Sequence, residues 1–191
     1  LSGTVTIDAV VARTLTNQTT LVLTSDTIKA NVALDNQGLL RVPNASTSAV
    51  NGALTNSGTI QVQTTGNGAA LVVASGFTNN GLIELENAAN GVAVSLTVNS
   101  GTLTNAAGRT IRSFGATTSA NSLDAQVMNL GTIAVDQPLM VVNAGRVFDS
   151  AGGTLNVAAG KTLLVNNGTT RIGGATGFGA GTGTLDLAGT H

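Results

Sequence analysis

The chain of 191 residues contains no cysteine, no tryptophan and no tyrosine, and it has one histidine. Without cysteine it can form neither a disulfide framework nor a thiolate metal site, and it has no thiol nucleophile. The histidine is the last residue, His191, where we expect a flexible end and not a catalytic base. A Ser-His-Asp catalytic triad is therefore not expected.

Aromatic and charged residues are scarce, at 2% and 9% of the chain. Large aromatic side chains normally fill the thick core of a globular domain, so their scarcity favours a thin core of stacked aliphatic side chains. The charged fraction is far below the roughly 25% of an average soluble domain. The net charge is −1 and no basic stripe is present, so nucleic acid is not an expected partner. No apolar run approaches the ~20 residues of a membrane-spanning helix, so we expect no membrane insertion of this segment.

The sequence is rich in apolar residues, at 42%, and it repeats. This apolar content favours an ordered chain over a disordered one. The repeated unit reads apolar-x-Asn-x-Gly-x-apolar-x-apolar, and it occurs at residues 34–42, 54–62, 77–85 and 127–135. A copy at residues 15–23 has Thr19 in place of glycine. Two looser copies start at Leu103, with a late Gly108, and at Val147, with Asp149 in place of asparagine and a late Gly153.

The polar position of this unit recurs at intervals of 19, 20, 23, 26, 24 and 20 residues, which is the span of one solenoid coil with variable loops. The sequence therefore predicts an all-β fold, a right-handed parallel β-solenoid of seven to eight irregular coils, as a single domain over residues 1–191. At the ~4.8 Å strand spacing, such a rod is roughly 35–40 Å long. Stacked coils would place the polar side chains above one another, where their amides can form a hydrogen-bonded ladder. The predicted ladder residues are Asn17, Asn36, Asn56, Asn79, Asn105, Asn129 and Asp149.

The apolar positions of the unit share one parity, so in an extended chain they all point to one face. We predict that the turn glycines Gly38, Gly58, Gly81 and Gly131 supply the positive φ that a tight corner needs. Further extended runs at 70–74, 92–98 and 139–142 are predicted to form the other walls of each coil. For 122–128, one helical turn and a strand fit the pattern equally well. Surface loops are predicted at 43–48, 64–68, 87–91 and 115–121, where Gly, Asn, Ser and Thr are frequent.

The stretches Leu-Thr-Asn-Ser-Gly-Thr-Ile at 54–60 and Thr-Asn-Asn-Gly-Leu-Ile at 78–83 resemble the repeats of filamentous-haemagglutinin-like and autotransporter passenger β-helices. The tail at 179–190 resembles an autotransporter-associated strand repeat. The resemblance implies an adhesin that is extracellular or exposed on a bacterial cell surface, with a host-surface or glycan ligand. It assigns no functional residue and no cofactor, and the irregular coil lengths depart from the strict period of the haemagglutinin arrays.

The partners expected besides a ligand are neighbouring repeats or domains of a longer parent chain, because the sequence starts at Leu1 without methionine. The end of a solenoid also presents unpaired strand groups, which favour sticking to another edge. We therefore expect end-to-end self-association.

A carbohydrate-active β-helix enzyme is the alternative function, since paired carboxylates on a β-helix can hydrolyse or cleave polysaccharides. Glu84 and Glu86 share one strand face, and Asp124, Asp136 and Asp149 follow in later coils. Stacking is expected to bring Glu84 close to Ala134 and not beside another acid. We interpret the acids as solvated outer charges and expect no enzyme activity, no catalytic residue and no metal ligand. Four arginines in the second half are interpreted as solubilising, in preference to an anionic-glycan contact: Arg109, Arg112, Arg146 and Arg171.

Ice binding is the third and least favoured function, because it needs a flat and regular threonine array. Thr55, Thr78 and Thr104 occupy equivalent positions, as do Thr59 and Thr132. The first row is interrupted by Asp35 and Met128, and the second by Leu39 and Leu82. The glycine-rich stretch 173–183 lacks the Lys-Ser/Thr of a phosphate loop and the acids of a calcium repeat, so we predict a flexible turn there.

Overall fold

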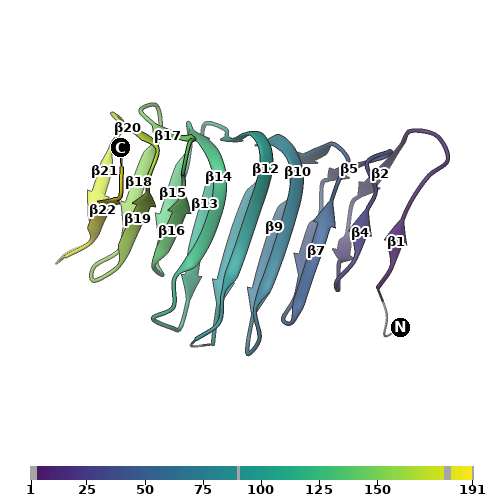
Figure 1. Cartoon of the computed structure of the whole chain (residues 1–191), viewed down its shortest axis with the longest axis horizontal. Coiled ribbons are helices and arrows are strands. Elements are labelled where there is room, and N and C mark those ends of the chain that lie inside the picture. The colour runs from purple at the N-terminus through teal and green to yellow at the C-terminus, as the bar shows by residue number, and fades with distance from the viewer. Residues whose placement is uncertain (1–3, 90, 179–181, 191) are drawn as a thin grey trace.

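The computed structural model describes residues 4–89, 91–178 and 182–190. Every regular element in these ranges is a β-strand, and the strands form parallel sheets that stack as coils (Figure 1). The predicted all-β parallel solenoid is thus confirmed. The described residues contain no helix that could cross a membrane.

Each complete coil has three walls, which we number in the order in which the chain runs through them. Wall 3 is a separate sheet of 8 strands with one strand from each coil, within the predicted range of seven to eight coils. It consists of β3 (Thr20–Val22), β6 (Leu39–Val42), β9 (Thr59–Thr64), β11 (Leu82–Asn87), β13 (Thr110–Gly115), β15 (Thr132–Val135), β18 (Thr154–Val157) and β21 (Thr176–Phe178).

Walls 1 and 2 belong to one 14-stranded sheet, because three long strands bend and run through both walls: β10 (Ala69–Asn79), β12 (Val94–Asn105) and β14 (Asn121–Asn129). The other strands of wall 1 are β1 (Thr6–Ile7), β4 (Thr27–Ile28), β7 (Ser46–Val50), β16 (Leu139–Val142), β19 (Thr162–Asn166) and β22 (Thr184–Ala188). Those of wall 2 are β2 (Arg13–Asn17), β5 (Val32–Asn36), β8 (Leu54–Asn56), β17 (Val147–Ser150) and β20 (Thr169–Ile172).

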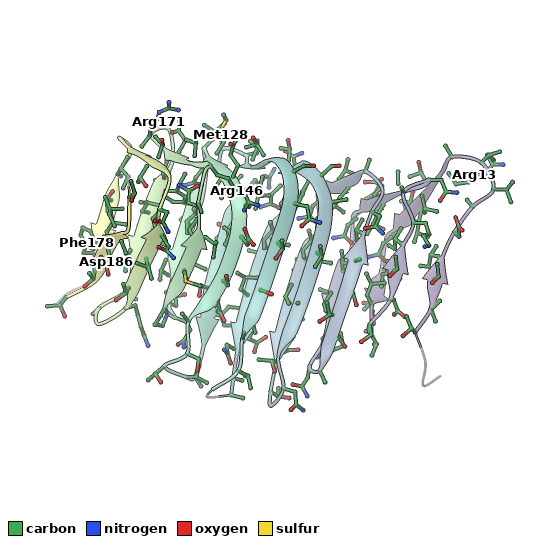
Figure 2. The ribbon with its side chains drawn as sticks, in the orientation of Figure 1. Arg13, Met128, Arg146, Arg171, Phe178 and Asp186 are labelled. Atoms are coloured by element: carbon green, nitrogen blue, oxygen red, sulfur yellow. The ribbon has the colours of Figure 1, made fainter. Side chains whose placement is uncertain are left out.

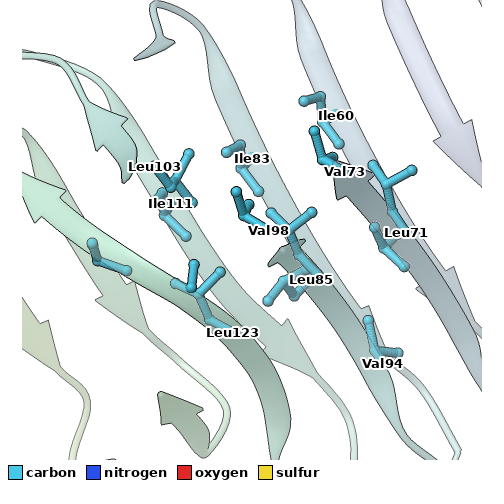
Figure 3. Packing of buried hydrophobic residues seen from close by; sticks show 14 of the residues in the cluster. Ile60, Leu71, Val73, Ile83, Leu85, Val94, Val98, Leu103, Ile111 and Leu123 are labelled. Carbon is cyan, nitrogen blue, oxygen red and sulfur yellow. The ribbon is translucent and has the colours of Figure 1, made fainter. Parts of the chain in front are cut away.

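Side chains alternate between the interior and the surface along each wall, as extended chain requires. In β11, Ile83 and Leu85 are fully buried, whereas Glu84 and Glu86 point outward and are half-buried. Equivalent residues of successive coils stack in register, so that Ile83 lies between Ile60 and Ile111. Figure 3 shows these aliphatic rows facing each other across the thin interior. Burying each such side chain contributes about 1.5–3 kcal/mol, so the stacked rows are the main source of stability.

Three local predictions need correction or completion. Residues 46–48, predicted as loop, begin strand β7, and the stretch 173–183, predicted as a flexible turn, contains strand β21. Residues 122–128 lie within strand β14, which decides between the two structures that fitted their pattern. His191 and residues 179–181 of the tail lie outside the described residues.

Candidate functional site

An asparagine ladder runs through the interior at the corner between walls 2 and 3. Its six asparagines are buried, and the amide nitrogen of each donates to the side chain of the next coil. The donor–acceptor distances from Asn17 to Asn36, Asn56, Asn79, Asn105 and Asn129 in succession are 2.7, 2.7, 2.6, 2.9 and 2.8 Å. The amide nitrogens also donate to backbone carbonyls at the start of wall 3, such as Asn36 to Thr59 O at 2.9 Å. These bonds satisfy polar groups that would be costly to bury unpaired.

The seventh ladder position belongs to Ser150 and not to the predicted Asp149. Asn129 donates to Ser150 Oγ at 2.9 Å, and Ser150 is buried. Asp149 pairs in register with Met128 on the outer face, where it lies 3.5 Å from the Arg171 guanidinium. The frame is shifted by one residue because Phe148, which is fully buried, takes the inner position that Val147 was expected to fill. An aspartate in the ladder would bury an unpaired charge, which costs far more than a hydroxyl.

The four predicted turn glycines are required for space and not for positive φ. None of them has a φ in the left-handed region. A Cβ added to Gly38, Gly58, Gly81 or Gly131 would lie 2.2, 2.1, 2.0 or 2.2 Å from a backbone oxygen of the preceding coil. In the looser copy, Gly108 does adopt a φ of 73° and has open space around it. The corner is therefore a close approach of two backbones, which any side chain would push apart.

The connections from wall 3 to wall 1 lie side by side along the lower edge of the molecule in Figure 1, and we call this row the loop edge (residues 43–45, 65–68, 88–89, 91–93 and 116–120). Successive loops bond to one another. Asn44 Oδ1 accepts from Thr64 Oγ1 at 2.7 Å and from Asn67 N at 2.6 Å, and Ser119 Oγ accepts from Gly91 N at 2.8 Å. Within these ranges the side chains are small and uncharged.

Most of the charged side chains of the central coils lie on the outer face of wall 3. We call these charged side chains, together with the uncharged side chains between them, the charged band. It consists of Arg41, Gln61, Gln63, Glu84, Glu86, Arg112, Phe114 and Asp136. One register row runs from Arg41 through Gln61, Glu84, Arg112 and Ala134 to Asn156, and a second joins Gln63, Glu86 and Phe114. The prediction that Glu84 lies next to Ala134 is wrong, because the looser copy at 103–115 forms a coil of its own and places Arg112 between them.

Hydrogen bonds hold the charged band in a fixed arrangement. The amide groups of Gln61 and Gln63 donate to Glu86 Oε2 at 3.2 and 2.7 Å, and Arg41 Nη2 donates to Gln63 Oε1 at 2.5 Å. Arg112 Nε donates to Asp136 Oδ2 at 2.7 Å. The guanidinium of Arg112 also lies 4.6 Å from the ring centre of Phe114, within the range of a cation–π contact.

Partial burial raises the pKa of the Glu84 carboxyl, and the nearby charge of Glu86 raises this pKa further, while Arg112 opposes both effects. The alternative of paired carboxylates therefore has a physical basis here, because Glu84, Glu86 and the Arg112 guanidinium share one surface. 

A shallow hollow of about 280 Å³ continues the charged band toward the C-terminal end of the rod. Its lining includes Asp136, Asn156, Gly177 and Phe178. The Phe178 side chain lies near the C-terminal end of the rod (Figure 2) and is 49% exposed. Among the described residues, no group of three or more histidines or acids is placed to hold a metal ion.

The remaining arginines and the threonine rows do not gather into a site. Arg146 pairs with Asp124 of wall 1 and Arg171 with Asp149 of wall 2, so neither joins Arg112 on wall 3. Thr55, Thr78 and Thr104 stack on the outer face of wall 2 but meet Asp35 at one end and Met128 at the other, as predicted. On wall 3, Thr110 and Thr154 flank Thr132, whereas Leu82 separates this group from Thr59.

Comparison with family models, curated proteins and solved structures found no significant match.

Proposed function

We propose that this chain is a structural and adhesive segment of a protein that is secreted by a bacterium or displayed on its surface. In this role it is a stiff rod, which presents its loops and outer walls for attachment and carries out no catalysis. The observation that supports the proposal is the continuous interior, in which the asparagine ladder and the aliphatic rows lock each coil to its neighbours. In a solenoid each coil contacts only its neighbours, so these continuous contacts between successive coils are what hold the rod in one shape.

The loop edge is the first surface proposed for attachment, to a glycan or to a matrix protein. Its segments from four successive coils lie together, and hydrogen bonds such as that from Asn67 N to Asn44 Oδ1 restrain them. The loops therefore lose less conformational entropy when a ligand binds. The resemblance of residues 54–60 and 78–83 to secreted adhesin repeats favours the same role.

Binding of the labelled protein to immobilised glycans and matrix proteins tests the proposal, with buffer alone as the blank. We expect saturable binding that falls when residues 65–68 or 116–120 are replaced by Gly-Ser segments of equal length. A complete lack of binding would contradict the adhesive part of the proposal and leave a spacer role, in which the rod only holds other domains apart.

A carbohydrate-active enzyme is the second candidate, and the observation that favours it is the raised pKa of Glu84 beside Glu86 and Arg112. A raised pKa lets a carboxyl hold its proton to higher pH than an ordinary carboxyl does, which is the property that a general acid requires. This candidate requires release of oligosaccharides from a polysaccharide, and it requires the loss of that release in Glu84→Gln and Asp136→Asn. Product formation that both variants retain would rule it out.

A further inference from the structure

We propose that the outer face of wall 3, from β6 to β18, binds an uncharged polysaccharide that lies along the rod axis. This inference rests on the proposed attachment role of the rod and moves the contact from the loop edge to the charged band and the adjoining hollow. It also names the chemical class of the ligand.

The first argument is the repetition of polar groups along the axis. The row from Arg41 to Asn156 carries a side chain of each coil at the ~4.8 Å spacing of paired strands, and five of its six side chains can form hydrogen bonds. A ligand that meets one such group after another must itself be extended and repetitive. A linear polysaccharide has this form, whereas a small molecule would use only one or two coils.

The second argument is that the band keeps hydrogen-bonding capacity for a ligand. Arg112 uses its Nε for Asp136, and within the described part of the chain neither its Nη groups nor the Glu84 carboxylate has a hydrogen-bond partner. The side chains of Arg112 and Asp136 are 44% and 45% exposed. The contact with the Phe114 ring and the ion pair with Asp136 restrain the guanidinium, so binding a ligand costs less conformational entropy.

The third argument is the aromatic side chain of β21, Phe178, which is the register partner of the buried Val157 and so lies in the inner row of wall 3 at the C-terminal end of the rod. Phe178 is 49% exposed and borders the hollow that Asp136 and Asn156 also line. The C–H face of a pyranose ring is apolar and packs well on an aromatic ring, while its hydroxyls reach neighbouring polar groups. An apolar surface flanked by a carboxylate and an amide supplies both parts of this contact.

The charge of the band decides between neutral and acidic polysaccharides. Glu84, Glu86 and Asp136 outnumber the two arginines, Arg41 and Arg112, so the band has a formal charge of −1 by this count. An acidic polysaccharide would be repelled by this excess of carboxylates. Hydroxyl groups both donate and accept hydrogen bonds, which matches a surface that presents guanidinium donors beside carboxylate acceptors. The loop edge offers neither charged nor aromatic side chains.

The test measures binding of the 191-residue protein to immobilised dextran, mannan, galactan and cellohexaose, with polygalacturonate and heparin as acidic probes. We expect saturable binding to at least one neutral probe, and weaker or no binding to the acidic ones. The variants Arg112→Gln and Asp136→Asn should each weaken it about tenfold or more, since hydrogen bonds to charged groups contribute about 1.5–3 kcal/mol.

The matched control is Arg171→Gln, because Arg171 also pairs with an aspartate on an outer face, but on wall 2. This variant should bind like the unmodified protein, and circular dichroism should show that all three variants keep their strand content. Equal weakening by Arg171→Gln, or preferential binding of the acidic probes, would overturn the inference.

The outcomes separate this inference from the proposed function. Binding that is lost on replacing residues 65–68 or 116–120, but is unchanged in Arg112→Gln and Asp136→Asn, keeps the adhesive role and overturns the wall 3 site. An absence of binding to every neutral probe also overturns the site. If matrix proteins still bind in that case, the adhesive role survives without it.

Discussion

The side chain of Asn79 connects three coils, which makes it a sensitive probe of the ladder. It accepts a hydrogen bond from Asn56 at 2.6 Å, donates to Asn105 at 2.9 Å, and is fully buried. The ladder therefore stabilises the fold mainly by keeping every buried amide satisfied.

Replacement of Asn79 by alanine should lower the free energy of unfolding by about 3 kcal/mol, since it leaves the Asn105 carbonyl oxygen buried without its ladder donor. Urea denaturation followed by circular dichroism measures the effect. The neighbouring Asn80 is exposed, so Asn80→Ala should change the midpoint little and serves as the control. Equal midpoints for the two variants would contradict the role assigned to the ladder.

Glu84 should make the free energy of unfolding decrease as the pH rises, because its surroundings raise its pKa. Its pKa in the folded protein is raised above the ordinary 4.5 by burial and by Glu86, against the opposing effect of Arg112. The folded protein therefore holds this proton over a range in which the unfolded chain has released it. The contribution of Glu84 to stability consequently falls as the pH rises through that range, and it is most unfavourable above the folded-state pKa.

The variant Glu84→Gln removes this unfavourable contribution, because glutamine has a similar shape and no charge. We expect its melting temperature to exceed that of the unmodified protein at pH 7 and to match it at pH 3, below both pKa values. Thermal scans at the two pH values measure the difference. A lower melting temperature at pH 7 would mean that the attraction between Glu84 and Arg112 outweighs the cost of burial.

At the residue level, the sequence predicted six of the seven ladder positions correctly and missed the last one. The unit starting at Val147 offers two apolar residues in succession, so the pattern alone could not decide which of them faces inward. The interior decides, because burial of Phe148 removes far more apolar surface from water than burial of Val147. Ser150 then falls into the ladder, and its hydroxyl gives no asparagine-like signal in the sequence.

At the scale of the single strand, β11 shows how alternation divides one segment between core and surface. Leu85 points inward and is fully buried between Val62 and Ser113, whereas Leu82 points outward between Thr59 and Thr110. Two leucines three residues apart thus have opposite environments, which composition cannot reveal. The alternation within the repeat separates them, and the register of the stack agrees with it.

Leu85→Ala should therefore cost about 3 kcal/mol of unfolding free energy through the cavity that it creates. Leu82→Thr should cost almost nothing, since its partners in both neighbouring coils are already threonines. Urea denaturation of both variants measures the contrast. If Leu82→Thr were the more destabilising change, the assignment of the two faces would be wrong.

A substitution can also test the close approach of two backbones at the corner between walls 2 and 3. Gly58→Ala would place a methyl group 2.1 Å from Gly38 O, so the coils must separate locally, at a cost of about 3 kcal/mol. Gly66 lies in the loop edge with its nearest contact at 4.0 Å, so Gly66→Ala is the matched control. Melting temperatures should fall for Gly58→Ala alone, and a similar fall for both would contradict the close approach of the backbones.

Strand positions were predicted better than the ends of strands or the outer surface. The apolar alternation and the Asn-x-Gly unit identified all three walls, but β7 begins at Ser46, inside a segment whose composition is typical of a loop. The charged band could not be predicted, because outer positions are not constrained by the repeat. Arg112 stands beside Glu84 because the coil of Asn105 follows the coil of Asn79 in the stack. The late Gly108 obscured the register of Arg112 in the sequence.

For the whole molecule, the decisive property is that coils contact only their neighbours. The interior is one hydrophobic cluster that extends from Leu23 to Val165, and the inner residues at its two ends are less protected. Leu187 is 48% exposed, whereas its register partner Val165, one coil further in, is fully buried. At the other end Val5 is 49% exposed. Stability should therefore decline from the middle of the stack toward both ends.

Hydrogen exchange followed by mass spectrometry should show this gradient in native conditions. We expect the slowest exchange in β11, β12 and β13, where each strand is paired on both sides, and the fastest in β1 and β22, which have a partner on one side only. In Asn79→Ala the protection of the central coils should fall most, because the ladder bonds to Asn56 and Asn105 are lost there. The variant Arg171→Gln should leave that central protection unchanged, since its ion pair lies on an outer face. Uniform exchange along the unmodified chain would mean that the coils unfold as one cooperative unit, so that the end coils are no weaker than the middle.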